Sequence, residues 1–386
     1  MASTISFTPN TYAGEHAGNY VSRALLGAKS LNGGLITVLP HVKKRAILRG
    51  VEQDVIFQDA SADFSADGNT TIDERYLDPV EMSVMYELKF RDLLQSWEAA
   101  QLRHGANGDI PTDLAQFLIE RMQTKINIGL EKLMWQGKSG SEFTFTPAYP
   151  GLLALINAST AAKRLSAVVG QLAVGSITIA ANAVVTVATT ANLNTGDKVT
   201  IIGANAATLV GGSPISGQSF TITVVSGTTF TLGVTTTGTA TTSTCYAQFV
   251  NASNVVEVLT TIYNTTPDEV KHQSDFVIYV PLHVADAYRV RQASVANGAG
   301  SYFSTDKALN FLGKTVQEMP YFNPNTVLAT RSSNLYFGTD LEADFNQIQV
   351  VDMRSTTADQ KIRYRANFAS DVNVAYMQEV LIYRPA

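Results

Sequence analysis

Cysteine is almost absent from this 386-residue chain, in which Cys245 is the only one. A single cysteine forms no disulfide within the chain, so the fold does not depend on an oxidising compartment. The sequence also lacks any run of about 18 apolar residues, the length that a membrane-spanning helix needs. Its first residues, MASTIS, contain no basic segment followed by an apolar run, which argues against a secretory signal. These absences predict a protein that is made in a cytoplasm and has no membrane span.

Catalytic and metal-binding motifs are also missing. The five histidines form no pair at metal-ligand spacing, and one cysteine makes no Cys-pair zinc site. There is no Gly-x-Ser-x-Gly nucleophile motif. Residues 135–139, WQGKS, resemble the end of a phosphate-binding loop, but Lys132 occupies the position of that loop's first glycine. The sequence therefore predicts neither an enzyme nor a bound cofactor. The histidines are His16, His41, His104, His272 and His283.

Composition is typical of a folded protein. Hydrophobic residues make up 45% of the chain and charged residues 16%, which excludes an intrinsically disordered protein. The length allows about two or three domains with a sizeable core. A net charge of −5 does not favour a sequence-specific nucleic-acid binder.

The first two zones of the chain carry opposite charge. Residues 1–45 contain five basic residues against Glu15 alone and are predicted to form an extended arm. Residues 46–92 contain eleven acidic residues against four basic ones and are predicted to form a long hairpin. The expected ascending limb runs over 46–57, and alternation predicts the descending limb over 80–90. Asp67-Gly68-Asn69 marks the turn at the tip.

The tip of this hairpin also contains the pattern of a calcium loop. Gly68 falls at the sixth position of that loop. Thr70 occupies the eighth position, where an apolar residue is usual, and neither flank is predicted to be helical. We therefore favour an acidic turn, with the calcium loop as the alternative. The residues of that loop are Asp63, Ser65, Asp67, Asn69 and Glu74.

Residues 93–145 are predicted to contain a long helix, over 111–136. Pro111 suits a first helical turn, and Gly137 suits the position after the last turn. Such a helix spans roughly 36 Å at about 1.5 Å per residue. Its apolar stripe consists of Leu114, Leu118, Met122, Ile126, Leu130 and Leu133.

A change of composition marks residues 165–250. Asp197 and Lys198 are the only charged residues between Arg164 and Glu257. Short stretches of alternating β-branched residues, separated by turn residues, predict a small inserted all-β domain, with a disordered low-complexity linker as the alternative. The expected strands are 185–187, 199–202, 220–225 and 230–232.

The remaining segments are predicted to be mixed helix and strand. Asn254 with Glu257 resembles a capping box that opens a helix to about Tyr263. Residues 276–280 are expected to form a strand that a helix follows from Pro281 onward. From residue 341 to the end, apolar residues alternate at period two, which predicts a β-rich tail.

This order of parts resembles the Hong Kong 97 fold, the α+β fold of the major capsid proteins of tailed bacteriophages. The segment TPAYPGL at 146–152 resembles the start of that family's axial domain, and DFVIYVP at 275–281 resembles its central strand-helix unit. The resemblance assigns an arm to 1–45 and the E-loop hairpin to 46–92. It assigns the peripheral domain to 93–145 and 341–386, with the spine helix over 111–136. The axial domain is then 146–164 and 251–340, interrupted by the inserted β-domain, 165–250.

The resemblance implies a structural subunit that self-assembles, as hexamers and pentamers, into an icosahedral shell around the double-stranded DNA of a phage. A separate scaffolding protein, a portal, decoration or auxiliary capsid proteins, and non-specific contact with packaged DNA are the implied partners. Two alternatives remain: the shell protein of an encapsulin-like cellular nanocompartment, and a phage protein that binds a glycan or receptor. The virion is the implied location.

Opposite charges on the arm and the hairpin predict contacts between subunits. A two-stranded hairpin is marginally stable alone in water, and complementary charge steers encounters and sets register. The alternative is that both are solvated surfaces. Some members of the family cross-link through a lysine of the E-loop, but residues 46–88 contain no lysine, so we expect a non-covalent shell. The predicted contact residues are Lys43, Lys44, Arg45, Asp59, Asp63, Asp67, Asp73 and Glu74.

Overall fold

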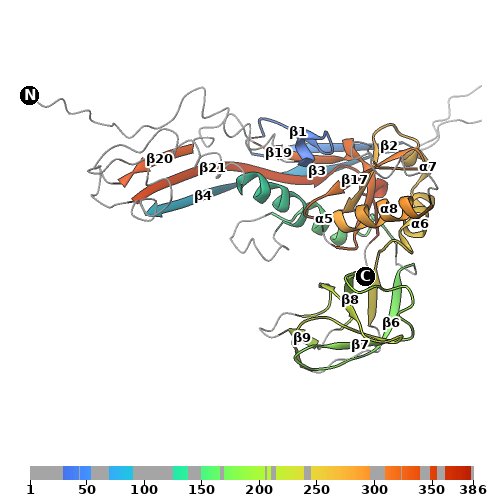
Figure 1. Ribbon diagram of the computed structural model, residues 1–386. Helices are drawn as coiled ribbons and strands as arrows, with labels where there is room; N and C mark the ends of the chain where they lie inside the picture. Colours follow the sequence, from blue (N-terminus) through green and yellow to red (C-terminus); the bar gives the residue numbers. More distant parts are fainter. Residues whose placement is uncertain are drawn as a thin grey trace, which may run out of the picture. The chain divides into compact units, whose positions relative to one another are not determined.

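The computed structural model forms two compact units, and the chain passes between them more than once. The first unit comprises Met1–Leu155 and Ser333–Ala375, and the second comprises Ile156–Ser332 and Tyr376–Ala386 (Figure 1). The structure describes residues 29–42, 44–53, 69–89, 125–137, 149–165, 169–204, 207–209, 214–238, 245–295, 309–322, 324–339, 348–353 and 361–383.

A five-stranded sheet dominates the first unit. Its order is β1-β19-β21-β20, and β4 also pairs with β21. The predicted β-rich tail contains a fourteen-residue strand, β21, along which Tyr364 and Ala366 are buried while Arg363 and Arg365 are exposed. β1 runs parallel to β19, and the other pairs are antiparallel. The strands are β1 (Thr37–Leu39), β4 (Val80–Lys89), β19 (Leu335–Thr339), β20 (Ile348–Asp352) and β21 (Lys361–Val374).

A separate two-stranded ribbon pairs β2 (Ala46–Gln53) with β3 (Thr70–Leu77), from Ala46 opposite Leu77 to Gln53 opposite Thr70. The predicted descending limb is therefore wrong. Residues 80–89 do form a strand, but β4 pairs along β21, with Val80 opposite Ser370 and Lys89 opposite Lys361. Alternation at period two identifies a strand but carries no information about its partner. Residues 54–68, which include the predicted tip, lie outside the described residues.

The predicted long helix is described over 125–136. Ile126, Leu130 and Leu133 of the predicted stripe are buried, as expected. The helix ends at Gly137, whose φ is 54° and whose N–H donates to the Leu133 carbonyl at 2.9 Å. A glycine in this left-handed conformation is a common helix stop. Residues 111–124 of the predicted helix lie outside the described residues. A four-residue helix, α2 (Lys29–Asn32), precedes β1.

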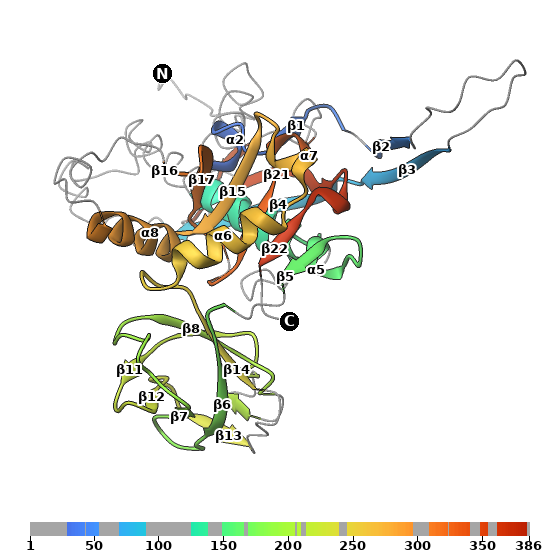
Figure 2. The same cartoon turned by 90° about the vertical axis from the view of Figure 1, so that its right-hand side faces the viewer.

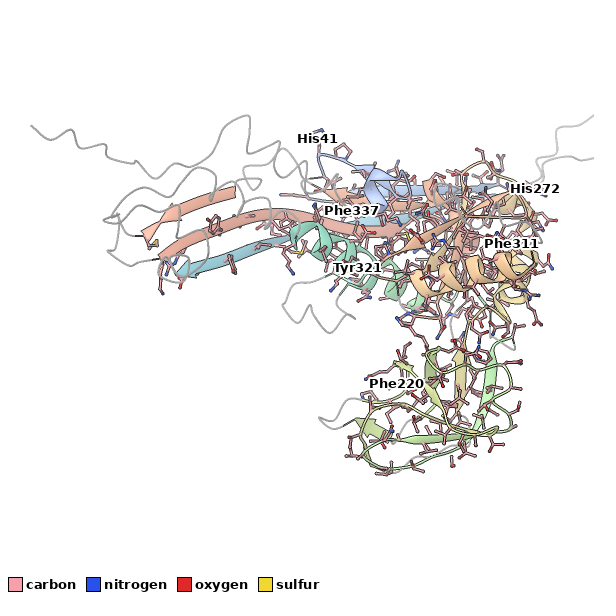
Figure 3. All side chains as sticks on the ribbon, in the orientation of Figure 1. His41, Phe220, His272, Phe311, Tyr321 and Phe337 are labelled. Atoms are coloured by element: carbon pink, nitrogen blue, oxygen red, sulfur yellow. The ribbon has the colours of Figure 1, made fainter. Side chains whose placement is uncertain are left out.

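In the second unit, a six-stranded sheet has the order β16-β17-β15-β18-β22-β5. The strand predicted over 276–280 is confirmed as β15, and the helix predicted to follow it is confirmed as α8. Helices α6 and α8 pack on the sheet around a shared apolar core (Figure 2). Phe311 of β16 packs edge-on against Tyr288 of α8, with ring centroids 6.1 Å apart (Figure 3). The strands are β5 (Lys163–Leu165), β15 (Phe276–Pro281), β16 (Leu309–Phe311), β17 (Lys314–Met319), β18 (Val327–Arg331) and β22 (Leu381–Tyr383).

The helical elements of this region are short. The helices are α5 (Leu152–Ala158), α6 (Val255–Thr265), α7 (Asp268–Lys271) and α8 (Leu282–Val295), with 3-10 turns η3 (Ser332–Asn334) and η4 (Met377–Glu379). Among the described helices, none is long and apolar enough to cross a lipid bilayer.

The last strand corrects a predicted boundary. We expected all of 341–386 to share one domain, but β22 pairs with β18 and β5 in the second unit. Arg331 of β18 binds Glu379, just before β22, through both its Nε and Nη2 atoms at 2.8 and 2.5 Å. A fully buried strand such as Leu381–Tyr383 shows no alternation, so its sheet cannot be assigned from pattern.

Residues 171–249, which we call the β-module, form a seven-stranded antiparallel sheet in the order β10-β8-β14-β6-β7-β12-β11, and a small β13-β9 pair (Figure 2). The module has its own apolar cluster, which includes Val185, Ile201 and Phe230. Three of the four predicted strands are confirmed, as β7, β8 and β12, and the disordered-linker alternative is wrong. The strand predicted over 220–225 is instead two strands, because β10 pairs with β8 whereas β11 pairs with β12. The strands are β6 (Gln171–Ile177), β7 (Val184–Val187), β8 (Lys198–Ile202), β9 (Ala207–Leu209), β10 (Ser219–Thr221), β11 (Thr223–Val224), β12 (Thr229–Thr231), β13 (Thr236–Gly238) and β14 (Tyr246–Phe249).

The predicted capping box before α6 is wrong. The helix begins after Asn254, but the Asn254 side chain makes no capping hydrogen bond. Its Oδ1 accepts from the Asn251 N–H at 2.9 Å, and its Nδ2 donates to the Phe249 carbonyl at 3.0 Å. The side chain therefore binds the segment that precedes the helix, three and five residues back in sequence, and these local bonds replace the capping bond.

Candidate assembly surfaces

One face of the β2–β3 ribbon is apolar and open to solvent. Residues directly opposite each other in an antiparallel pair share a face, so the register places Ile47 beside Tyr76 and Val51 beside Ile72. The ion pair Arg49–Glu74, at 3.2 Å, lies between these two apolar pairs. We call these six residues the ribbon face. Its apolar members are Ile47, Val51, Ile72 and Tyr76, which are 47%, 56%, 61% and 44% exposed.

The root of the ribbon is packed on the first unit's sheet. Leu77 is fully buried, and a Cβ at Gly338 of β19 would lie 3.4 Å from its Cδ1 atom. Asn373 of β21 donates from Nδ2 to the Tyr76 carbonyl at 2.6 Å. The ribbon is therefore held at its base, while its four large apolar side chains remain about half exposed.

Charged groups reinforce this root. Asp371 of β21 accepts the Asp78 N–H at 2.7 Å, and Arg45 binds the Asp78 carboxylate at 2.9 Å while lying over the Tyr76 ring. Burial raises the pKa of Asp371 to about 6. Hydrogen bonding to Asp78 raises the pKa of Arg45. Arg45 and Asp78 are largely exposed, so solvent screens this pair and it contributes little to stability.

The predicted contact residues lie in and around this root where they are described. Arg45 and Glu74 are paired within the chain, Asp73 lies 3.9 Å from Arg75, and Lys44 is exposed. Lys43, Asp59, Asp63 and Asp67 lie outside the described residues, so their predicted contacts remain predictions.

The calcium-loop alternative is described at two of its five positions. Asn69 is exposed, and Glu74 lies within β3, where it accepts from Arg49 and from the Tyr76 hydroxyl. Asp63, Ser65 and Asp67 lie outside the described residues. Within the described part of the chain, no cluster of three or more histidine, cysteine or carboxylate residues could hold a metal ion.

A buried polar contact fixes part of the predicted arm, at α2, to the long helix. Glu131 is 3% exposed and accepts both the N–H of Ser30, at 3.2 Å, and its hydroxyl. The indole Nε1 of Trp135 donates to the Ser30 hydroxyl at 2.9 Å. A buried carboxylate is costly unless it is hydrogen-bonded, so these bonds hold α2 against the helix. The sequence signal was a glutamate inside an apolar stripe, and our sequence reasoning missed it.

The β4–β21 strands present a second exposed surface. Met85 and Tyr86 of β4 are exposed. Glu87 lies between Lys361 and Arg363, at 2.8 and 2.9 Å, and hydrogen bonding to these two cations lowers the pKa of Glu87. This surface combines two apolar side chains with paired charged groups, whereas the ribbon face carries two apolar cross-strand pairs, one on each side of the Arg49–Glu74 ion pair. The sequence missed the ribbon face because it assigned β2 the wrong partner.

Comparisons with known proteins find similarity in structure. No family model matches the chain, and no curated protein matches it. The chain is similar to the capsid of an empty GTA particle, with 12% identity, a TM-score of 0.48, and coverage of 100% of this chain and 95% of that chain. The chain is also similar to the satellite phage P4 procapsid including the size determination protein, with 10% identity, a TM-score of 0.46, and coverage of 95% of this chain and 98% of that chain. A third similar structure is a virus-like particle from Pyrococcus furiosus, with 8% identity, a TM-score of 0.42, and coverage of 96% of this chain and 98% of that chain. These three are structures of a capsid, a procapsid and a virus-like particle.

Proposed function

We propose that this chain is a structural subunit that self-assembles into the capsid of a tailed phage, and that it performs no catalysis. The observation that carries the proposal is the ribbon face, with four large apolar side chains about half exposed on a projecting pair of strands. A two-stranded ribbon is at best marginally stable in water. Its apolar face therefore favours a partner.

The occupant that we propose is a second copy of this chain. Fully burying a large apolar side chain contributes about 1.5–3 kcal/mol, so covering the exposed half of four gives about 3–6 kcal/mol before the cost of association. Residues 46–92 are acidic and residues 1–45 are basic. A basic arm from one copy is thus complementary to the hairpin of another, which sets the register of the contact.

Finer assignments follow from the same proposal. Residues 46–77 are the E-loop, 111–136 the spine helix, and 165–250 an inserted domain of a Hong Kong 97-type subunit. Copies assemble as hexamers and pentamers, with a scaffolding protein, a portal, and decoration or auxiliary proteins as partners, in the host cytoplasm. Their interior surface contacts packaged DNA without reading its sequence. The mature location is the virion.

The ribbon face can be tested by a charge substitution. Val51→Asp together with Ile72→Asp is expected to abolish shells, seen by size-exclusion chromatography and negative-stain microscopy of the full chain expressed with its scaffolding protein. Both side chains are exposed in the single chain, so the variant's unfolding midpoint should stay close to wild type.

A matched control is Val225→Asp, because Val225 is 63% exposed and lies in the β-module. This variant is expected to assemble normally. Normal shells from the Val51→Asp, Ile72→Asp variant would contradict the role of the ribbon face. A wild-type chain that never forms large particles, with or without scaffolding protein, would overturn the proposed function.

A further inference from the structure

The β-module is joined to the six-stranded sheet region through a buried polar junction. We propose that Asn325 is the residue that locks the two together, so that the β-module is a rigid extension and not a freely tethered domain. This inference concerns the chain's internal mechanics and does not rest on the proposed shell function.

Asn325 is buried in a left-handed backbone conformation, and its side-chain amide is hydrogen-bonded at both ends. It is fully buried and has a φ of 56°, a left-handed conformation that asparagine tolerates better than most side chains. Its Oδ1 accepts the Val250 N–H at 3.1 Å and contacts His283 Nε2 at 2.9 Å. An amide oxygen donates nothing, so His283 Nε2 carries the proton of this bond.

The other end of the same amide binds the β-module. Asn325 Nδ2 donates to the Thr200 hydroxyl at 3.0 Å, to the Lys198 carbonyl at 3.1 Å and to the Gln248 carbonyl at 3.3 Å. One side chain thus joins α8, the segment after β14, and strands β8 and β14. Leaving such buried groups without their partner costs free energy.

A second clamp comes from the segment that leaves the β-module. Asn251 donates from Nδ2 to the Asn192 carbonyl and to Asp197 Oδ2, both at 2.7 Å. Asn192 and Asp197 lie in the loop before β8, so this clamp ties the start of α6 back to the module.

The two linking segments are also in direct contact. The Phe249 N–H donates to the Gly170 carbonyl at 2.8 Å. A Cβ at Gly170, where φ is 76°, would lie 2.4 Å from the Phe249 carbonyl oxygen. A freely tethered domain needs flexible linkers. The two segments that enter and leave the β-module are instead hydrogen-bonded to each other, and they approach so closely at Gly170 that only glycine fits.

The test is hydrogen–deuterium exchange of the full-length chain, read by mass spectrometry. Asn325→Gly keeps the positive φ but removes the side chain. We expect amides 249–251 to exchange at least tenfold faster, with β7 and β12 keeping wild-type protection. The matched control is Asn182→Gly, which removes one bond inside the module, from the Gly233 N–H at 3.1 Å. It should leave 249–251 unchanged.

Two results would overturn the inference. Wild-type exchange at 249–251 in Asn325→Gly would show that the side chain locks nothing. Simultaneous loss of protection in β7 and β12 would show that it supports the module's fold and not its attachment. If Asn325→Gly is insoluble, Thr200→Val removes one acceptor at almost constant volume and should accelerate exchange at 249–251 about threefold or more. No acceleration in that variant would equally refute the lock.

Discussion

The contact between Gly137 and Gly151 offers a sharp prediction about the first unit. A Cβ at Gly137 would lie 1.8 Å from the Gly151 nitrogen, and a Cβ at Gly151 would lie 2.4 Å from the Gly137 nitrogen. Ordinary carbon contacts begin near about 3.5 Å, so Gly137→Ala must push the two backbones apart. That movement breaks the bridge between Gly137 and Pro150. The positive φ of 54° adds about 1–2 kcal/mol for alanine. We expect a total loss of about 4 kcal/mol or more.

Matched variants separate these contributions. Gly34→Ala tests the left-handed conformation alone, since Gly34 has a φ of 64° and no atom within 4 Å of the added Cβ. It should cost about 1–2 kcal/mol. Gly129→Ala lies in the same helix as Gly137 and meets no atom within 4 Å. It should stabilise the helix by about 1 kcal/mol. Gly151→Ala tests the collision without the positive φ.

The assay is urea unfolding of the unassembled chain, followed by tryptophan fluorescence in a Trp97→Phe background. The chain has two tryptophans, and Trp135, two residues from Gly137, is fully buried. Its emission therefore reports on this unit. A Gly137→Ala variant no less stable than Gly34→Ala would refute the argument that the close approach of the two backbones requires glycine.

Two further predictions concern buried carboxylates of the first unit. Burial raises the pKa of Asp371 to about 6, so between about pH 4 and pH 6 the folded state binds more protons than the unfolded state, and this residue lowers stability as pH rises through that window. Asp371→Asn keeps an acceptor for the Asp78 N–H, and its free energy of unfolding should exceed that of wild type by about 1–3 kcal/mol between pH 4.5 and pH 7. If urea unfolding gave the variant and the wild type the same dependence of this free energy on pH, the prediction would be contradicted. Glu131→Ala leaves the Ser30 N–H and hydroxyl without their acceptor and should cost about 2–4 kcal/mol. Faster hydrogen exchange at 29–32 should accompany that loss, and wild-type exchange there would show that Glu131 does not hold α2.

Local sequence patterns predicted several helices and strands correctly. Strands β7, β8 and β12 of the β-module follow from β-branched alternation, β15 with α8 from a change of period, and the helix that ends before Gly137 from glycine after an apolar stripe. These signals come from neighbours in sequence. The same local logic failed at Asn254, whose side chain binds Asn251 and Phe249 and leaves the helix uncapped. Propensity places asparagine at a helix start, but backbone groups of the preceding segment compete for its amide, and the sequence pattern does not show which group it binds.

The sequence by itself determined the position of several helices and strands, the opposite charge of the arm and the hairpin, and the separate all-β composition of residues 165–250. Only the tertiary structure decided partners: β3 and not β4 for β2, β21 for β4, and the six-stranded sheet for β22. The apolar ribbon face and the Asn325 junction depend on those pairings. The physical reason is that a residue's alternation or burial tendency is local, whereas register and long-range hydrogen bonds depend on which distant segment packs against it.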